Sequence, residues 1–230
     1  MQRQSSWIPV CAGVLIWATA AVGDAQQARV QAVDANGAPI FKVDPFWPKP
    51  LPNRWSMQQV TGIHVDHEDH IWFLNRAAAA EGDEIGGDGN PPRIDCCVRG
   101  PEVVELDQDG KVVHAWGGPG YHPLWPAALQ TVIADRQGFV WVGGTAPQDS
   151  ILKFTRDGKQ LVQTIGTPNK SGADATHFNR PTFLTWLPDS TMFVADGYNG
   201  TRVAKFDKDG KFVTAWGTRG NGPGQFNVVH

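Results

Sequence analysis

The sequence has few cysteines and no excess of positive charge. Of its 230 residues, three are cysteine, and 20 Lys and Arg stand against 23 Asp and Glu, for a formal net charge of −3. A nucleic-acid-binding protein needs a basic surface to neutralise phosphates, so nucleic acid is excluded as a partner. Charged residues at 19% and hydrophobic residues at 41% also exclude a disordered acidic chain and a membrane bundle.

Long hydrophobic runs are scarce, and the main one lies near the start of the chain. Residues 7–22 are almost wholly apolar, Arg3 precedes them, and the small residues Gly23 and Ala25 follow. A run of this length is short for a transmembrane helix, which needs about 20 residues. The pattern predicts a signal peptide over 1–25, cleaved after Ala25. We therefore expect an exported protein, periplasmic or secreted, with no membrane contact once the leader is removed.

Removal of the leader would leave Cys96 and Cys97 as the remaining cysteines. In an oxidising compartment two thiols are expected to pair. Adjacent residues, however, have Cα atoms about 3.8 Å apart across a trans bond, below the usual disulfide range. A strained bridge between neighbours and two reduced thiols in a loop both remain open.

Glycine, proline and tryptophan are abundant, at 26, 17 and 10 residues, and they accompany an internal repeat. Asp-Gly pairs begin at 109, 157 and 209, in steps of 48 and 52 residues, each between alternating apolar runs. Asp-Gly in this setting is typical of a β-hairpin, because the tight turn needs a positive φ. A second hairpin phrase recurs at 63–73, 132–142 and 184–194. The composition and the repeat predict an all-β fold.

Two hairpins per period of about 50 residues make a four-stranded unit, the blade of a β-propeller. A β-helix is the alternative, but its coils are too short for this period. The tryptophans on repeated strand positions, at 72, 116, 141 and 216, are expected in the core or between blades. Residues 26–230 would hold about four blades. We expect a chain truncated within a further blade, or one that self-associates through open blade edges.

One spacing departs from the period. The step from Trp72 to Trp141 is 69 residues, against 52 from Trp141 to Phe193, and the excess falls on 77–99. We predict an insertion loop there. The glycines around Asp88 hint at calcium but lack the spaced carboxylates of a calcium loop, which favours a flexible linker.

Several phrases carry a resemblance to a known family. They are Val-Thr-Gly-Ile-His-Val-Asp at 60–66, Asn75-Arg76, His-Phe-Asn-Arg-Pro-Thr at 177–182, Val-Ala-Asp-Gly-Tyr-Asn-Gly-Thr-Arg at 194–202 and Pro-Gly-Gln-Phe-Asn-Val-Val-His at 223–230. The chain resembles NHL repeats, which build six-bladed propellers. It is similar in particular to the catalytic domain of peptidyl-α-hydroxyglycine α-amidating lyase. The resemblance is specific over 177–230 and implies an NHL-type propeller with about four of six blades present.

The resemblance also implies a site. Lyases of this family hold zinc in the central channel through histidines at the starts of inner strands, bind calcium deeper, and flank the zinc with a tyrosine and arginines. Carried over, Tyr198 and Arg76 are the catalytic candidates and His230 is the metal ligand. Gln130 stands where a second histidine ligand is expected. His122, from the same loop, is the alternative ligand.

Three functions follow from these residues. The first is a metal-dependent lyase that splits a carbon–nitrogen bond to give a peptide amide and glyoxylate, inactive here because one histidine cannot hold catalytic zinc. The second is a non-catalytic propeller that binds a small molecule or peptide in its channel, or a protein partner. The third is sugar-lactone hydrolysis, for which the chain lacks the expected carboxylate ligands at the matched positions. Arg202 is expected to brace a turn, and His64, His67 and His70 to lie on a solvated turn.

Overall fold

The computed structural model describes residues 32–145 and 147–230. The predicted signal peptide lies outside these residues. The chain divides into two units, 1–44 and 45–230. In the described part of the first unit, Val33 pairs with Pro39 in an isolated bridge, and the Asp34 carboxylate accepts hydrogen bonds from the N–H groups of Asn36 and Ala38.

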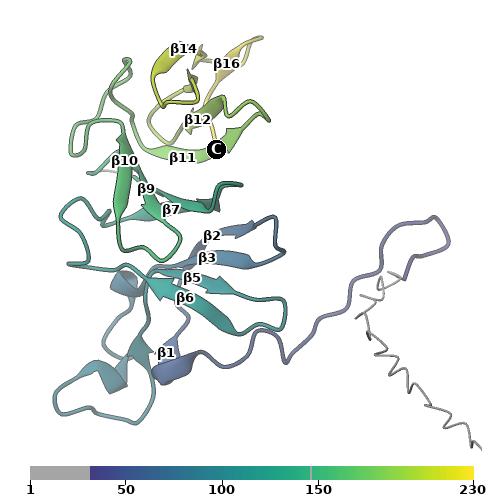
Figure 1. The fold of residues 1–230 in the computed structure, drawn as a ribbon, viewed down its shortest axis with the longest axis vertical. Helices are drawn as coiled ribbons and strands as arrows, with labels where there is room; N and C mark the ends of the chain where they lie inside the picture. Colours follow the sequence, from purple (N-terminus) through teal and green to yellow (C-terminus); the bar gives the residue numbers. More distant parts are fainter. Residues whose placement is uncertain (1–31, 146) are drawn as a thin grey trace, which may run out of the picture. The chain divides into compact units, whose positions relative to one another are not determined.

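The second unit contains three four-stranded antiparallel sheets, which we call blades (Figure 1). Blade 1 contains β2 (Val60–Val65), β3 (Ile71–Asn75), β5 (Val103–Leu106) and β6 (Val112–Trp116). Blade 2 contains β7 (Leu129–Ala134), β8 (Phe139–Gly144), β9 (Ser150–Thr155) and β10 (Leu161–Ile165). Blade 3 contains β11 (Pro181–Trp186), β12 (Met192–Asp196), β13 (Arg202–Phe206) and β14 (Phe212–Trp216). In each blade the strands pair in chain order.

The shorter elements lie outside the blades. β1 (Trp55–Ser56) pairs in parallel with β4 (Val98–Arg99), and β15 (Thr218–Arg219) with β16 (Gln225–Phe226). The helices of the described residues are the 3₁₀ turns η1 (Pro52–Arg54), η2 (Ala77–Ala79) and η3 (Gly86–Asp88). None of these turns is long and apolar enough to cross a bilayer.

Consecutive blades pack through their first strands, β2 against β7 and β7 against β11. This is the arrangement of propeller blades around a common axis, so the all-β, four-stranded-blade prediction is confirmed. The described residues form three complete blades rather than about four. The segment before β2 and the insertion 77–99 add chain length without adding a blade.

The repeated Asp-Gly pairs form the turns between the third and fourth strands. Gly110, Gly158 and Gly210 have φ of +78°, +75° and +77°. Side chains with a β-carbon rarely adopt this conformation, which explains the recurrence of glycine.

The hydrophobic core lies between neighbouring blades. Trp72, Trp116 and Trp141 are at most 6% exposed, and they pack against residues of the adjacent sheet as expected. Trp216 differs, because it is 45% exposed and meets the ring of Phe193 edge-on at 6.0 Å.

The insertion 77–99 adds no blade and makes contacts within itself. Arg99 forms a 2.6 Å ion pair with Asp88 and donates hydrogen bonds to the carbonyls of Ala77 and Ala80. Cys96 and Cys97 are joined by a disulfide bond. The Asp88 carboxylate is therefore occupied by an arginine of the same loop.

Candidate functional site

The residues singled out by sequence lie together at one end of the first strands. Arg76 follows β3, Gln130 is the second residue of β7, Tyr198 follows β12, and His230 reaches the same place from beyond β16. We call these four residues the inner-strand cluster.

Short contacts link the cluster from end to end. Tyr198 Oη lies 2.9 Å from His230 Nε2, and Gln130 Nε2 lies 3.4 Å from the same nitrogen. Arg76 Nη2 donates to Gln130 Oε1 at 3.1 Å, and Arg76 Nε donates to the carbonyl of Leu129 at 2.7 Å. Tyr198 is 41% exposed, so solvent or a ligand can reach the phenol.

Two buried carboxylates hold the backbone beneath Tyr198. The N–H groups of Gly197 and Tyr198 both donate to the carbonyl of Arg180, at 3.2 Å each. The Arg180 N–H in turn donates to the buried carboxylate of Asp149 at 2.9 Å. Asp196 accepts a 2.6 Å bond from the N–H of residue 179, which fixes the same segment.

Arg202 braces this turn, as predicted. Its guanidinium donates to Asp196 at 2.7 Å and to the carbonyls of Ala173 and His177. Burial raises the pKa of Asp196, and the nearby charge of Asp149 adds to the rise, although the bonds from Arg202 and the backbone oppose it.

Gly197 allows the segment that carries His230 to pack closely against blade 3. A β-carbon on Gly197 would lie 2.5 Å from the carbonyl oxygen of Val229, closer than any real contact. Thr182 Oγ1 also donates to that carbonyl at 2.9 Å. The alternative ligand His122 is not brought to the cluster: its ring accepts a bond from the Leu124 N–H and packs edge-on to Phe154.

The inner-strand cluster does not by itself fit a catalytic zinc ion. Such an ion takes three protein ligands and a water, normally imidazoles, thiolates or carboxylates. Among the described contacts of His230 are a phenol and a primary amide, and the amide oxygen is bonded to the positive charge of Arg76. One imidazole beside a guanidinium favours an anionic or hydrogen-bonding ligand over a metal cation.

A second polar cluster lies between blades 1 and 2, and sequence reasoning missed it. Asp66, His70 and Glu105 place one potential metal ligand each within 4.8 Å of one another. His70 Nδ1 lies 2.6 Å from Glu105, so the prediction of a solvated turn is wrong for His70. Blade 2 inserts Arg156 among them, 2.9 Å from Asp66 and in contact with Glu105. A guanidinium thus holds the place that a cation would take.

The signal for this cluster is present in the repeat. Glu105 occupies the position of Lys153 and Lys205 in the other two blades. Its carboxylate is fully buried and also lies 2.6 Å from Nδ1 of His114. Burial by itself would raise the pKa of Glu105, but the bonds from Arg156 and the two histidines outweigh it and lower that pKa.

Comparison with known proteins places the chain among NHL-repeat relatives. No family model matches it. The chain is 35% identical over 187 residues to rat peptidylglycine alpha-amidating monooxygenase. The aligned region covers 75% of this chain and 18% of the rat protein. It is 26% identical over 204 residues to mouse NHL repeat-containing protein 3, covering 84% of the chain and 50% of that protein.

A third relative is a nematode lyase. The probable peptidyl-alpha-hydroxyglycine alpha-amidating lyase of Caenorhabditis elegans is 26% identical over 176 residues, covering 75% of this chain and 48% of that protein. The chain is an NHL-repeat propeller related to the amidating lyases. It spans half or less of the length of each of these three relatives. In this propeller the four residues of the inner-strand cluster come from all three blades and the segment beyond β16.

Proposed function

We propose that this chain carries a carbon–nitrogen lyase site of the amidating type, which splits an N-acyl-α-hydroxyglycine into an amide and glyoxylate. The observation that carries the proposal is the 2.9 Å contact between Tyr198 and His230, within one cluster with Arg76. The relationship to amidating lyases supports the substrate class.

The reaction needs a base for the hydroxyl proton and a partner for the carboxylate. In the proposed step, Tyr198 takes the hydroxyl proton while its own proton passes to Nε2 of His230. The hydroxyl oxygen becomes the carbonyl of glyoxylate as the carbon–nitrogen bond breaks. The amide nitrogen keeps the bond's electron pair and receives a proton from the same pair of side chains. Arg76 suits the substrate carboxylate, because a guanidinium binds carboxylates in a bidentate manner.

The test is release of glyoxylate from N-benzoyl-α-hydroxyglycine by the full chain, measured above the spontaneous rate. Tyr198→Phe should lower kcat/KM by about 10²–10⁴-fold, the usual contribution of a general acid or base. Tyr121→Phe is the matched control, since Tyr121 donates to the carbonyl of Gly158, away from the cluster. Release at the spontaneous rate, with or without added zinc, would exclude the lyase.

The second function is a propeller that binds a carboxylate ligand without cleaving it. Gln130 favours this function, because an amide stands beside His230 where the resemblance leads us to expect a second histidine. A propeller of this kind would have no lyase activity, as the single histidine leads us to expect. Binding of N-benzoyl-α-hydroxyglycine that is lost in Arg76→Ala, without glyoxylate release, would support it.

We also propose that residues 1–25 direct export and are then removed. The apolar run after Arg3 and the small residues at 23 and 25 support this proposal. Mass spectrometry of the protein recovered from the cell envelope or medium should show a chain that begins at Gln26. Recovery of the uncleaved chain in the cytoplasm would contradict export.

A further inference from the structure

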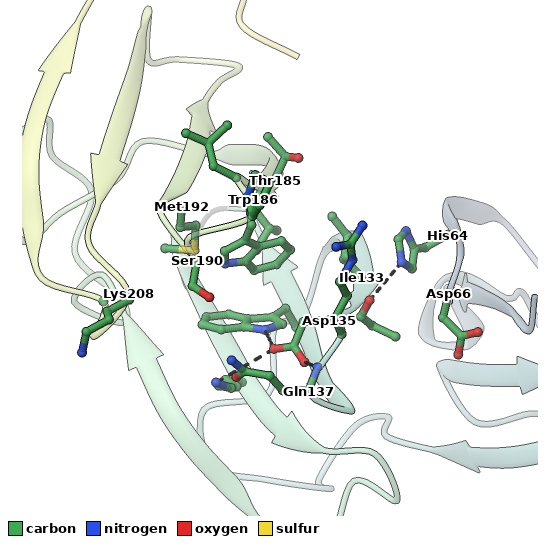
Figure 2. A pocket seen from close by; sticks show the side chains of 18 of the residues that line it. His64, Asp66, Ile133, Asp135, Gln137, Thr185, Trp186, Ser190, Met192 and Lys208 are labelled. Atoms are coloured by element: carbon green, nitrogen blue, oxygen red, sulfur yellow. Dashed lines mark hydrogen bonds and ion pairs between the residues drawn. The ribbon is translucent and has the colours of Figure 1, made fainter. Parts of the chain in front are cut away.

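A cavity of about 860 Å³ opens at the end of the first strands opposite the inner-strand cluster. It is lined from the ends of β2, β7 and β11, and blade 3 closes one side of it (Figure 2). Gln163 of blade 2 donates a 3.0 Å bond to the carbonyl of Asp209 in blade 3, which joins the two blades at the cavity wall. Neither the lyase proposal nor its residues use this cavity.

The interface between blades 1 and 2 shows what normally fills such a space. There, the guanidinium carbon of Arg156 lies 5.3 Å from the ring centroid of Trp72. Its Nη2 pairs with Asp66, whose other contacts include a 2.9 Å bond from Trp72 Nε1. The space over the indole is therefore occupied by an arginine of the next blade.

The interface between blades 2 and 3 repeats this design without the arginine. Trp141 Nε1 donates to Asp135 at 2.8 Å, as Trp72 does to Asp66. Lys208 stands at the repeat position of Arg156, but it pairs with the neighbouring Asp209 at 2.8 Å. Among the described residues, Lys153 and Trp186 contact the Trp141 ring in place of an arginine, and the cavity lies beside them.

Blade 3 adds an indole that the repeat does not require. Trp186 stands where blades 1 and 2 have Val65 and Ala134. Its ring lies 5.3 Å from that of Trp141, tilted by 53°, and both residues line the cavity. Figure 2 shows Trp186 among the lining side chains. Leu187, 49% exposed, replaces the aspartate of the other blades. These two changes make this part of the wall more apolar.

The cavity lining carries charges of both signs, from four aspartates and from Arg136, Lys153 and Lys208. Asp135 lies 4.0 Å from Lys153 Nζ, and that ammonium sits 4.8 Å from the ring centroid of Trp141. With Lys208 paired to Asp209, the lining offers no strong excess of either sign. Neither an anion nor a cation therefore gains from a surplus of opposite charge, which favours a neutral ligand.

Neutral hydrogen-bonding groups surround the indoles. In the part of the chain that the structure describes, the hydrogen bonds leave the side chains of Gln137, Ser190 and Trp186 available for a ligand. Indole faces pack against apolar ring faces, while amides and hydroxyls bond to hydroxyl groups. We infer that this cavity binds a neutral oligosaccharide of about two or three sugar units, a size that suits its volume.

The test is titration of the full chain with cellotriose and with triacetylchitotriose, by isothermal calorimetry and saturation-transfer NMR. We expect at least one of these neutral sugars to bind, and trigalacturonate, which is anionic, to bind at least tenfold more weakly. Trp186→Ala should weaken binding at least tenfold. Trp216→Ala is the matched control, because Trp216 is 45% exposed and lies outside the cavity lining.

Trp186 also packs against the core between blades 2 and 3, so Trp186→Ala removes core contacts as well. A second variant therefore changes the cavity without changing the core. Lys208→Arg changes an exposed side chain of the lining and should place a guanidinium inside the cavity, at the repeat position of Arg156. It should weaken sugar binding about tenfold with an unchanged melting temperature. Absence of binding by both neutral sugars, or binding unaffected in both variants, would overturn the proposal. Either result is separate from the glyoxylate assay.

Discussion

Substitution of one residue, Gln130, by histidine would give the inner-strand cluster two histidines. The amide nitrogen of Gln130 lies 3.4 Å from His230 Nε2, so an imidazole placed there would face a second imidazole. Gln130→His should therefore tighten binding of Co²⁺ or Zn²⁺ by at least about tenfold, or about 1.4 kcal/mol. Visible absorption of the Co²⁺ complex measures this affinity.

The control for that variant is Gln130→Ala, which removes the amide without adding a ligand. It should leave metal affinity at the level of the unchanged chain. Equal metal affinity in Gln130→His and Gln130→Ala would show that the two positions do not meet in a metal-binding geometry.

Loss of Arg156 should lower the free energy of unfolding by an amount that can be estimated. Its guanidinium compensates two carboxylates with fully buried side chains, Asp66 and Glu105. Removing one partner of a buried ion pair typically costs about 3–5 kcal/mol, because the other charge stays buried and unpaired. Arg156→Met should lower the free energy of unfolding by about 3 kcal/mol at pH 7. Urea denaturation measures the change, and Arg136→Met, at an exposed position, is the control.

The cost of losing Arg156 should depend on pH. The pKa of Glu105 and that of Asp66 are lowered, since bonds from their partners outweigh the effect of burial. A lowered carboxyl pKa contributes stability above its unfolded value, here 4.5 and 3.8, and loses it as pH falls through the folded pKa. The difference between the unchanged chain and Arg156→Met should shrink below about pH 4. A difference that grows on acidification would contradict this account.

At the scale of the element, the hairpin turns combine backbone conformation with packing. Gly158 has a φ of +75°, and a β-carbon there would lie 2.3 Å from the Trp116 ring. Gly138 has a φ of +83° with nothing within 4 Å of that position. Gly138→Ala should cost about 1–2 kcal/mol from backbone strain alone. Gly158→Ala should cost about 1 kcal/mol more, because Trp116 must shift. Thermal unfolding of the two variants compares them, and equal costs would contradict a role for packing.

At the scale of the whole molecule, several apolar side chains of the blades face solvent. Ile63 on β2 is 68% exposed, Phe183 on β11 is 48% exposed, and Val213 on β14 is 51% exposed. Exposed apolar residues on strands promote association with other chains. We predict that this chain self-associates, so its sedimentation coefficient should rise with concentration. Ile63→Ser should reduce the rise, and a concentration-independent monomer would exclude the prediction.

The blades could be predicted from the sequence. Their period, the Asp-Gly turns and the strand pairing are local properties, because each hairpin joins residues that are close along the chain and each turn demands a positive φ at glycine. The family resemblance selected Arg76, Tyr198 and His230 as candidates, although the roles of these residues stay predictions.

The contacts between side chains could not be predicted in this way, because they join residues that are far apart along the chain. Gln130 and His230 are 100 positions apart, and their contact depends on the close approach that Gly197 permits. Arg156 and Lys208 share a repeat position, yet one enters a buried carboxylate cluster and the other pairs with its neighbour. The partners of Arg156 come from blade 1, whereas Lys208 pairs with an adjacent residue of its own turn. The carboxylates that the neighbouring blade presents decide between these outcomes, and the repeat spacing does not reveal them.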